Sequence, residues 1–319
     1  MNILVTGATG LLGKTIQKME NKFCCGQCSG CPWKNKPFYY APSSSDCDLT
    51  VWKDTQDLID MVQPSHVVHL AGVVGGIQDN VNRPFEFSID NLLMNSNITD
   101  ICVENNIPLI VASSTCVYPA EVNKYPLTED MVDSGPPEKT NSAYAYAKRA
   151  MTHSLRAAHK QYDYNFSVLY FSNLYGEFDH FENENKAHLV TALIKKFHKA
   201  KEEGKDKVTL LGTGKPLRQF MYAEDAAKII QKVLKMGCWG EYNVATPENL
   251  SVSEIATIVA EIVGYTGDIE YNGELDGVYR KDASSDRLLG VIGEYEFTKL
   301  KDGVYKTYES FLEKQTCGS

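Results

Sequence analysis

The feature that most constrains the fold is a set of three glycines, spaced three residues apart, after the first apolar run of the chain. Residues 2–6 are typical of a buried parallel strand, and residues 14–19 have a helical pattern. A tight strand–helix turn needs residues without a β-carbon, for the turn itself, for backbone approach to a pyrophosphate, and for helix packing. The N-terminus of the helix then faces the anion.

We therefore interpret the start of the chain as a strand–turn–helix unit that binds a dinucleotide. A glycine-rich turn without a ligand is the alternative. The residues expected to contact the cofactor are Gly7, Thr9, Gly10, Leu11, Leu12 and Gly13.

Further apolar runs alternate with helical patterns along the chain. The runs are residues 38–41, 66–70, 108–112 and 166–170, and the helical patterns are residues 55–62, 89–105 and 143–161. Strands that alternate with helices need crossover connections, which produce a parallel, doubly wound sheet. The sequence thus predicts an α/β fold of the Rossmann type.

The second half of the chain is less regular and has no clean linker or repeat. Ser251, followed three residues later by Glu254, is typical of a capping box at the start of a helix. We predict a nucleotide-binding domain at residues 1–175, to which residues 216–240 return. Residues 176–215 and 241–319 would form a smaller, discontinuous substrate-binding lobe.

Composition excludes several classes of protein. With 43% hydrophobic and 23% charged residues among 319, the chain is neither disordered nor collagen-like. A net charge of −9 argues against nucleic acid as a partner. The longest nearly apolar stretch, residues 67–77, is well short of the ~20 residues of a membrane span. We expect no membrane segment, and the odd number of cysteines, nine, favours a cytoplasmic protein with free thiols.

The segment after the second predicted strand bears on the choice between NAD and NADP. NAD-binding units usually have an acid there that holds the ribose hydroxyls. Here Ser43 and Ser44 follow the strand, and no carboxylate occurs before Asp46. Hydroxyls without an acid suit a 2′-phosphate, so we favour NADP(H), with Asp48 and Leu49 at the adenine edge. A simple capping loop is the alternative.

Tyr144 and Lys148 are one helical turn apart within residues 143–161. An ammonium beside a phenol favours the phenolate, so we expect the pKa of Tyr144 to be lowered toward neutral. Such a tyrosine exchanges a proton with a carbonyl or an alcohol, although this spacing also occurs by chance. Ser114 follows the strand at residues 108–112, where open parallel sheets bind ligands, and its hydroxyl suits the same carbonyl.

With these motifs the sequence resembles the extended short-chain dehydrogenase/reductase family and, more narrowly, the GDP-L-fucose synthases. The resemblance implies NADPH-dependent 3,5-epimerisation and 4-keto reduction of GDP-4-keto-6-deoxy-D-mannose to GDP-L-fucose. It runs through nearly the whole chain and is carried by residues 5–13, 69–71, 74–76, 114–119, 144–148, 173–176, 188–189, 212–220 and 280–281.

The resemblance implies a two-part reaction at one site. Cys116 removes protons from the third and fifth ring carbons, and His188 returns one to the opposite face. Ser114 and Tyr144 stabilise the enolate oxygen, and Tyr144 supplies a proton when the fourth carbon is reduced. Lys148 also holds the nicotinamide ribose.

The same resemblance implies further binding residues, no metal, and a homodimer formed through a four-helix bundle that includes the helix at residues 143–161. Arg218 and Lys281 would pair with the GDP diphosphate. The additional cofactor contacts are Leu70, Ala71, Gly72, Asn173 and Leu174. The substrate contacts are Ser114, Asn173, His188, Lys196, Arg218 and Lys281.

Two segments depart from the family pattern. After residues 173–176 the family usually has Pro-His-Asp-Asn-Phe, whereas residues 177–181 here are Glu-Phe-Asp-His-Phe. His180 therefore competes with His188 as the acid, and we choose His188 because the helix after it fits the family. Leu211 stands where an aromatic side chain often lines the guanine pocket.

Residues 24–31 contain four cysteines and have no counterpart in the family: Cys24, Cys25, Cys28 and Cys31. The spacing leaves open zinc, an iron–sulfur cluster, a reversible disulfide or free thiols. We favour thiols or a disulfide because the usual second pair of metal ligands is missing.

Two other functions remain open. One is a 4-reductase of a GDP-keto-deoxy sugar that does not epimerise its substrate. The other is a non-catalytic paralogue that binds NADP, against which the intact Ser114, Tyr144 and Lys148 argue.

Overall fold

The computed structural model describes residues 2–23, 38–40, 43–45, 47–181, 188–273, 276 and 278–317. The cysteine-rich segment at residues 24–31 lies outside these residues, so the hypotheses about it stay open.

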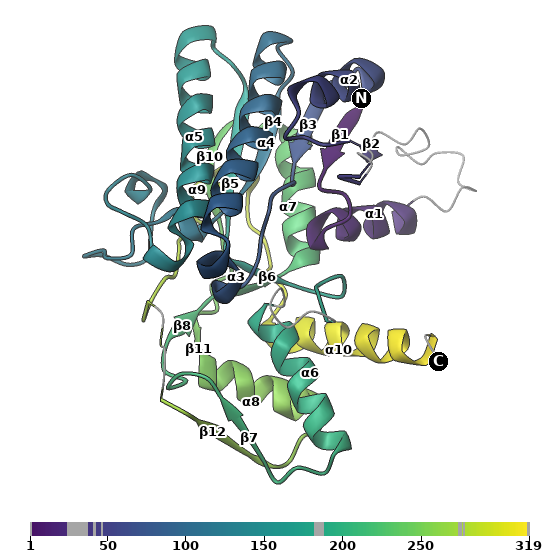
Figure 1. The fold of residues 1–319 in the computed structure, drawn as a ribbon, viewed down its shortest axis with the longest axis vertical. Coiled ribbons are helices and arrows are strands. Elements are labelled where there is room, and N and C mark those ends of the chain that lie inside the picture. Colours follow the sequence, from purple (N-terminus) through teal and green to yellow (C-terminus); the bar gives the residue numbers. More distant parts are fainter. Residues whose placement is uncertain are drawn as a thin grey trace.

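A six-stranded parallel sheet forms the centre of the larger part of the molecule (Figure 1). In spatial order its strands are β10 (Gly240–Val244), β5 (Phe166–Phe171), β4 (Leu109–Ser114), β3 (His66–His69), β1 (Ile3–Thr6) and β2 (Phe38–Tyr40). The chain starts at β1, adds β2 on one side and the other strands on the opposite side. The predicted doubly wound α/β fold is confirmed, with the strand order reversing between β1 and β3.

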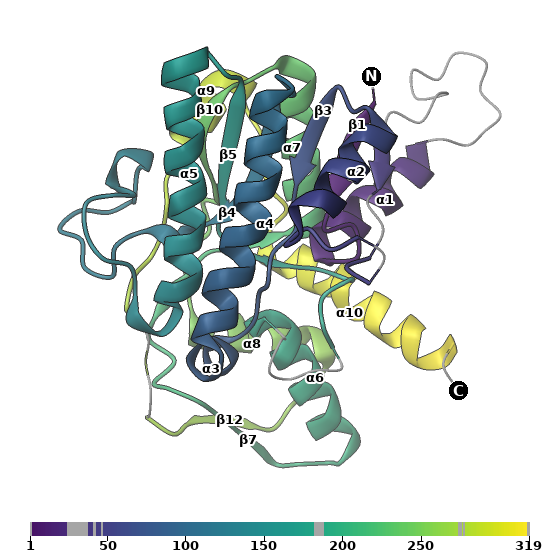
Figure 2. The same ribbon diagram turned by 45° about the horizontal axis from the view of Figure 1, so that its top comes forward.

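Helices cover both faces of this sheet (Figures 1 and 2). One face packs against α2 (Trp52–Val62), α4 (Pro84–Glu104) and α5 (Ser142–Tyr162), and the other against α1 (Leu11–Phe23), α7 (Ala223–Met236) and α9 (Asp286–Ile292). Side chains along a strand point to alternate faces. Accordingly, Leu4 packs with the first layer of helices, while its neighbours Ile3 and Val5 pack with the second.

A smaller lobe follows, with its own apolar core around Phe197, Val259 and Val304. Its helices are α6 (Leu189–Glu202), α8 (Val252–Val263) and α10 (Leu300–Cys317), and α3 (Ile77–Asn82) precedes α4 in the larger part. The short strand pairs are β6 (Asn173–Tyr175) with β9 (Phe220–Tyr222), β7 (Lys207–Leu210) with β12 (Asp268–Tyr271), and β8 (Leu217–Arg218) with β11 (Leu250–Ser251). The predicted capping box of Ser251 and Glu254 is present at the start of α8.

The structure differs from the predicted division of the chain after residue 240. Strand β10 is an edge strand of the large sheet, and α9 packs against it and α7. The buried side chains of Leu288 and Ile292 explain this placement, because they complete the apolar cluster beneath α7. Residues of the C-terminal part therefore return to the sheet a second time.

The glycine turn brings the backbone of three segments together at the carboxyl end of β1. Gly7 has a φ of +70°, and a β-carbon there would lie 2.6 Å from the backbone nitrogen of Ala71. A β-carbon on Gly13 would lie 2.5 Å from the carbonyl oxygen of Gly7. Both positions therefore require glycine, and they bring the N-terminus of α1 against the segment that follows β3.

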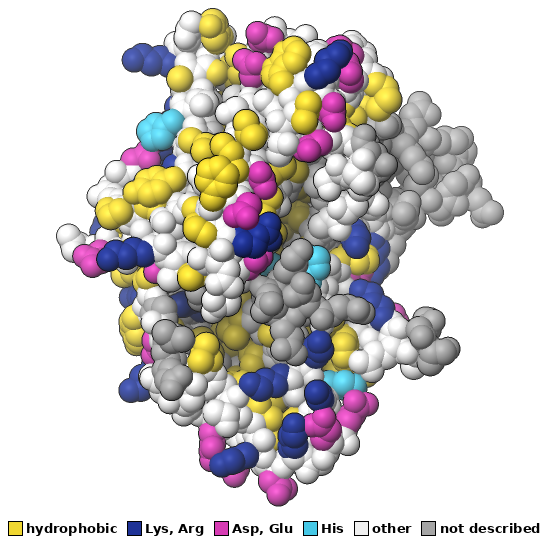
Figure 3. Space-filling view, viewed as in Figure 1, with side chains coloured by type: hydrophobic (Ala, Val, Ile, Leu, Met, Phe, Trp, Pro, Cys, Tyr) yellow, Lys and Arg dark blue, Asp and Glu magenta, His cyan; other side chains and the backbone are white. Residues whose placement is uncertain are grey.

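Helices α4 and α5 lie side by side and leave apolar side chains on their outer face. Phe85 is 72% exposed, Tyr146 is 51% exposed and Leu93 is 41% exposed. Figure 3 shows hydrophobic side chains distributed along this side of the molecule. Within the described part of the chain, none of the helices has the length and apolar character needed to cross a bilayer.

We predict that Gly13→Ala destabilises the fold, because the added methyl group meets backbone atoms, which cannot move aside as a flexible side chain would. The free energy of unfolding should fall by about 1–3 kcal/mol in urea titrations. Gly290→Ala is the matched control, since a β-carbon on that helical glycine meets nothing within 4 Å. It should stabilise the protein by up to ~1 kcal/mol. Equal effects of the two substitutions would show that the packing argument is wrong.

Candidate active site

The predicted cofactor residues of β1, β3 and α5 meet at the carboxyl end of the sheet. Ala71 borders the glycine turn, and Gly72 borders α4 and α5, because a β-carbon on it would lie 3.1 Å from Asn91 Oδ1 and 3.6 Å from Lys148 Nζ. The Asn91 side chain fixes this segment by bonding both the N–H and the carbonyl of Val73, at 3.1 and 3.0 Å.

Lys148 is a buried cation beside Gly72, with only 3% of its surface exposed. Its ammonium donates to the carbonyl of Ala112 over 3.2 Å, and burial lowers its pKa to about 8. A buried ammonium is costly unless polar groups surround it, so the hydroxyls of a ribose would suit this position. The glycine turn likewise fits a pyrophosphate, since it leads into the N-terminus of α1 and its Thr9 is exposed.

The segment at residues 43–49 has more internal contacts than the sequence suggested. Ser44 is exposed, and the carbonyl of Ser43 accepts from the N–H of Cys47 at 3.1 Å. The Asp48 carboxylate accepts from the N–H and hydroxyl of Thr50, at 2.9 and 2.8 Å. Leu49 is buried in the core below α2 and α4. The Ser43 hydroxyl lies 2.5 Å from that of Ser45. The contact of Ser43 and Ser44 with a phosphate stays a prediction, and Leu49 contributes mainly to packing.

A short turn after β4 presents Ser114 and Cys116 together. The Ser114 hydroxyl accepts from the N–H of Cys116 at 3.2 Å, which caps the 3-10 turn η1 (Thr115–Val117). Arg149 of α5 holds the turn from behind, donating to the carbonyls of Val117 and Gly135 at 2.7 and 2.8 Å. Arg149 was not predicted from the sequence, because it lies next to Lys148 but carries no motif of its own.

The expectation of a lowered Tyr144 pKa is wrong. Desolvation raises the pKa of the phenol above its usual value, and the nearby Cys116 raises it further. Lys148 Nζ lies 5.9 Å from the centre of the Tyr144 ring, and its hydrogen bond goes to Ala112 rather than to the phenol. Tyr144 therefore stays protonated at neutral pH, which suits a proton donor.

Arg218 of β8 is a half-buried cation near enough to Cys116 for a thiolate there to affect its pKa. Its guanidinium donates to the carbonyls of Leu217 and Val278, at 2.8 and 2.7 Å. Burial lowers the pKa of Arg218, opposed by the negative charge of Asp276 and of a Cys116 thiolate. Because carbonyls hold this cation, its charge is available to an anionic ligand.

Asn173 and Leu174 occupy β6, between the two parts of the molecule. The Asn173 amide donates to the carbonyl of Gln219 at 3.0 Å, and Leu174 packs on the core beneath α7. The buried Gln219 side chain in turn bonds Ala283 and Thr246. Gln219 is a second residue missed by the sequence analysis, which treated it only as part of the family motif.

His188 directly precedes α6 and faces a buried carboxylate. Its Nδ1 lies 3.1 Å from both oxygens of Asp179, which is 6% exposed. Desolvation lowers the pKa of His188, but the hydrogen bond and charge of Asp179 outweigh it, so the net pKa is raised. The His180 side chain is exposed, and only its backbone N–H bonds Asp179. Asp179 was missed as a functional residue, although it matches the aspartate of the family segment.

For the remaining residues predicted to contact substrate, the structure shows no hydrogen bond or ion pair with Cys116, Tyr144 or His188 among the described residues. Lys196 is exposed on α6 and donates to the carbonyl of Thr209 over 2.7 Å, so it connects α6 to β7. Lys281 is half-buried beside Arg280. Leu211, at the position expected for the guanine pocket, is 62% exposed.

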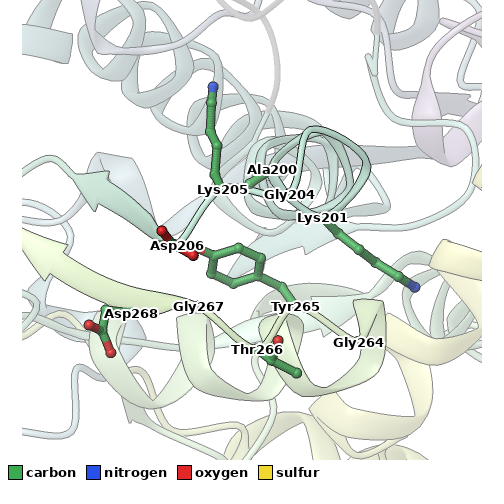
Figure 4. Close-up of a pocket in the computed structure, with 10 residues that line it drawn as sticks. All are labelled: Ala200, Lys201, Gly204, Lys205, Asp206, Gly264, Tyr265, Thr266, Gly267 and Asp268. Carbon is green, nitrogen blue, oxygen red and sulfur yellow. The ribbon is translucent and has the colours of Figure 1, made fainter.

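A pocket of about 400 Å³ lies at the C-terminal ends of α6 and α8 (Figure 4). It is separated from His188 by the length of α6, roughly 20 Å for a helix of this size. Its Lys201 donates to the carbonyl of Val263, and its Tyr265 stacks on Phe197. None of the predicted site residues lines this pocket, so we place the candidate site at the carboxyl end of the parallel sheet instead.

Comparison with known proteins shows which proteins the chain resembles. Residues 3–245 match the NAD dependent epimerase/dehydratase family. A GDP-L-fucose synthase of Dictyostelium discoideum is 31% identical over 98% of this chain and 95% of its own length. A GDP-L-colitose synthase of Yersinia pseudotuberculosis is 32% identical over 99% of both chains. The crystal structure of a GDP-L-fucose synthetase of Naegleria fowleri bound to NADP is 30% identical, with a TM-score of 0.85 over 98% of this chain and 93% of that chain.

We predict that Lys148→Met stabilises the protein at pH 7. The pKa of Lys148 is lowered from 10.5 to about 8, so below pH 8 the folded state carries the whole penalty of a buried ammonium. A difference of one pH unit between the pKa values of the folded and unfolded states corresponds to about 1.4 kcal/mol, and with relaxation we expect a gain of about 1–3 kcal/mol. Between pH 8 and 10.5 the folded protein loses this proton first, so the advantage of Lys148→Met should shrink.

Urea titrations from pH 7 to 10 measure this difference. Lys235→Met is the control, because Lys235 is exposed on α7 and should leave the pH profile unchanged. An advantage of Lys148→Met that is constant across this pH range would contradict the assigned cause.

Proposed function

The chain belongs to the NAD dependent epimerase/dehydratase family, within the branch that holds the GDP-L-fucose synthases, and we propose that it makes GDP-L-fucose. The substrate would be GDP-4-keto-6-deoxy-D-mannose, which is epimerised at the third and fifth ring carbons and reduced at the fourth. The observation that carries the proposal is the position of Cys116, on the turn after β4 beside Ser114, where a thiolate would act on both Tyr144 and Arg218. A base, a proton donor and a diphosphate-binding cation would thus surround one substrate.

The cofactor of this reaction is NADP(H). The glycine turn and the N-terminus of α1 would hold its pyrophosphate, Lys148 the nicotinamide ribose, and Ser43 with Ser44 the 2′-phosphate. The solved relative bound to NADP supports this choice. NADPH, when bound, supplies the hydride that reduces the fourth ring carbon.

Epimerisation uses two residues on opposite faces of the sugar ring. The 4-keto group acidifies the protons at the neighbouring carbons, which the Cys116 thiolate removes one at a time. Donors from Ser114 and Tyr144 stabilise the enolate oxygen that forms. His188, kept protonated by Asp179, returns a proton to the other face.

Reduction uses the Tyr144 phenol as its proton donor. Since burial keeps this phenol protonated, it can transfer its proton to the alkoxide oxygen at the fourth carbon. Arg218 would hold the diphosphate, together with Lys281, and so keep the sugar between Cys116 and His188.

A colitose synthase among the relatives keeps a neighbouring GDP-sugar reaction open as the alternative. The test is NADPH consumption with GDP-4-keto-6-deoxymannose, followed by NMR of the product formed in heavy water. We expect GDP-L-fucose with deuterium at the third and fifth carbons. Reduction without inversion would favour the 4-reductase, and NADPH binding without turnover would favour the non-catalytic paralogue.

Two substitutions separate the two halves of the reaction. Tyr144→Phe should bind NADPH normally and lose reduction by on the order of 10²-fold or more, because the proton donor is removed. Cys116→Ser should bind NADPH normally and lose deuterium exchange at the ring carbons. Ring exchange in Cys116→Ser at the rate of the parent would show that another residue is the base.

We also propose that the protein is a homodimer joined through α4 and α5. The apolar side chains on this face, among them Phe85, Leu93 and Tyr146, support a bundle of four helices with a second copy. Light scattering at micromolar concentration should give about twice the 35.6 kDa of one chain. Leu93→Lys should shift the mass toward one chain, whereas a monomeric parent would refute the proposal.

The chemistry favours the cytoplasm as the compartment. Cys47, Cys102, Cys116 and Cys238 are free, and Cys116 must remain a thiol to act as a base. A reducing compartment preserves such thiols.

A further inference from the structure

Asp179 is a buried carboxylate whose oxygens are all engaged near the candidate site. Oδ1 accepts from the N–H of His180 at 2.8 Å, and Oδ2 accepts from the hydroxyl of Thr191 at 2.5 Å. Both oxygens also lie 3.1 Å from Nδ1 of His188. Three donors from the loop and from α6 therefore fix the carboxylate, and the carboxylate fixes the imidazole.

The loop that carries Asp179 is itself held from two distant parts of the chain. Lys18 of α1 and Lys314 of α10 lie over the ring of Phe178, at 5.8 and 5.2 Å from its centre. Lys18 also pairs with the Glu177 carboxylate, and Lys314 donates to the Glu177 carbonyl. Phe181 packs on Phe311 of α10, with ring centres 4.9 Å apart. Three of these contacts use side chains where this chain departs from the family segment, at positions 177 and 178.

We propose that Asp179 is a positioning residue that orients His188 and keeps it ready to donate a proton from Nε2 during epimerisation. This inference rests on the proposed function of His188 as the acid. Because both carboxylate oxygens engage Nδ1, the proton on Nε2 is the one left to transfer. The donors from Thr191 and His180 keep the carboxylate ionised, so it stabilises the imidazolium rather than taking its proton.

Electrostatics agree with this arrangement. Desolvation raises the pKa of Asp179, yet the His188, Thr191 and His180 bonds outweigh it and leave the pKa lowered. Asp179 is the charged group that acts on the His188 imidazole, whereas Lys18 and Lys314, which hold the same loop, bind Glu177. Asp179 is therefore the charge that sets the protonation of His188.

The test compares Asp179→Asn with the parent by two independent readouts. The first is an NMR titration of the His188 ring in the whole protein, assigned by its loss in His188→Asn. The parent ring should titrate above the usual range of a histidine, and the Asp179→Asn ring at lower pH, because a neutral amide no longer stabilises the imidazolium. An unchanged ring pKa would overturn the inference, as would a parent ring that titrates in the usual range. The parent titration alone decides this if Asp179→Asn does not fold.

The second readout separates inversion from simple exchange. With NADP⁺ in place of NADPH, the sugar is not reduced, and NMR in heavy water distinguishes deuterium returned to the same face from deuterium returned with inversion. Asp179→Asn should slow inversion by about 10-fold or more at pH 8, with a smaller loss at pH 6. Same-face exchange through Cys116 should continue. An inversion rate with the pH profile of the parent would overturn the inference.

Asp225→Asn is the matched control. Asp225 is also buried, at 2% exposure, and also accepts three hydrogen bonds, but from Tyr295 and Thr298 rather than from a histidine. It should change neither the His188 titration nor the ratio of inversion to exchange. If the parent shows no inversion at all, the proposed function fails while the ring titration still tests the contact between Asp179 and His188.

Discussion

The close approach of two backbone segments, at the carboxyl ends of β1 and β3, is the constraint on which the rest of the structure depends. Gly7 passes Ala71 with no room for a β-carbon, and α1 passes the same turn at Gly13. Strands β1 and β3 are neighbours at the point where the strand order reverses, which is where open parallel sheets bind ligands. Backbone atoms form this part of the site. Its shape therefore depends on glycines, which have no β-carbon, and not on the rotamers of side chains.

Buried amides connect this part of the site to the smaller lobe. Asn91 fixes the segment after β3, and Asn173 bonds the backbone of Gln219, whose side chain bonds Ala283 and Thr246. A buried amide left without a partner costs about 1–3 kcal/mol, so each bond favours one register of the segments that it joins. A lobe assembled from separate stretches of chain is in this way held in a fixed position relative to the sheet.

Apolar periodicity predicted most of the sheet and its helices, but it missed β10. In that strand Glu241 bonds Arg156, and Asn243 bonds the buried Tyr118. These polar residues interrupt the apolar pattern from which a buried strand is predicted. Local patterns were also insufficient to predict the whole candidate site. Motifs identified the residues that would touch ligand, whereas Asp179 acts only through a contact nine residues away. The direction of the Tyr144 pKa shift could be determined only from the fold, because desolvation depends on packing that no local pattern encodes.

The cations of the site differ from other arginines of the chain in what holds them. Arg156 and Arg287 pair with carboxylates, which largely neutralise their charge. Lys148, Arg149 and Arg218 instead donate to backbone carbonyls. A carbonyl dipole orients a cation without cancelling its charge, so these three groups produce a positive region within a chain of net charge −9. Such a region suits the anionic dinucleotide and nucleotide sugar of the proposed function, at the carboxyl end of the sheet.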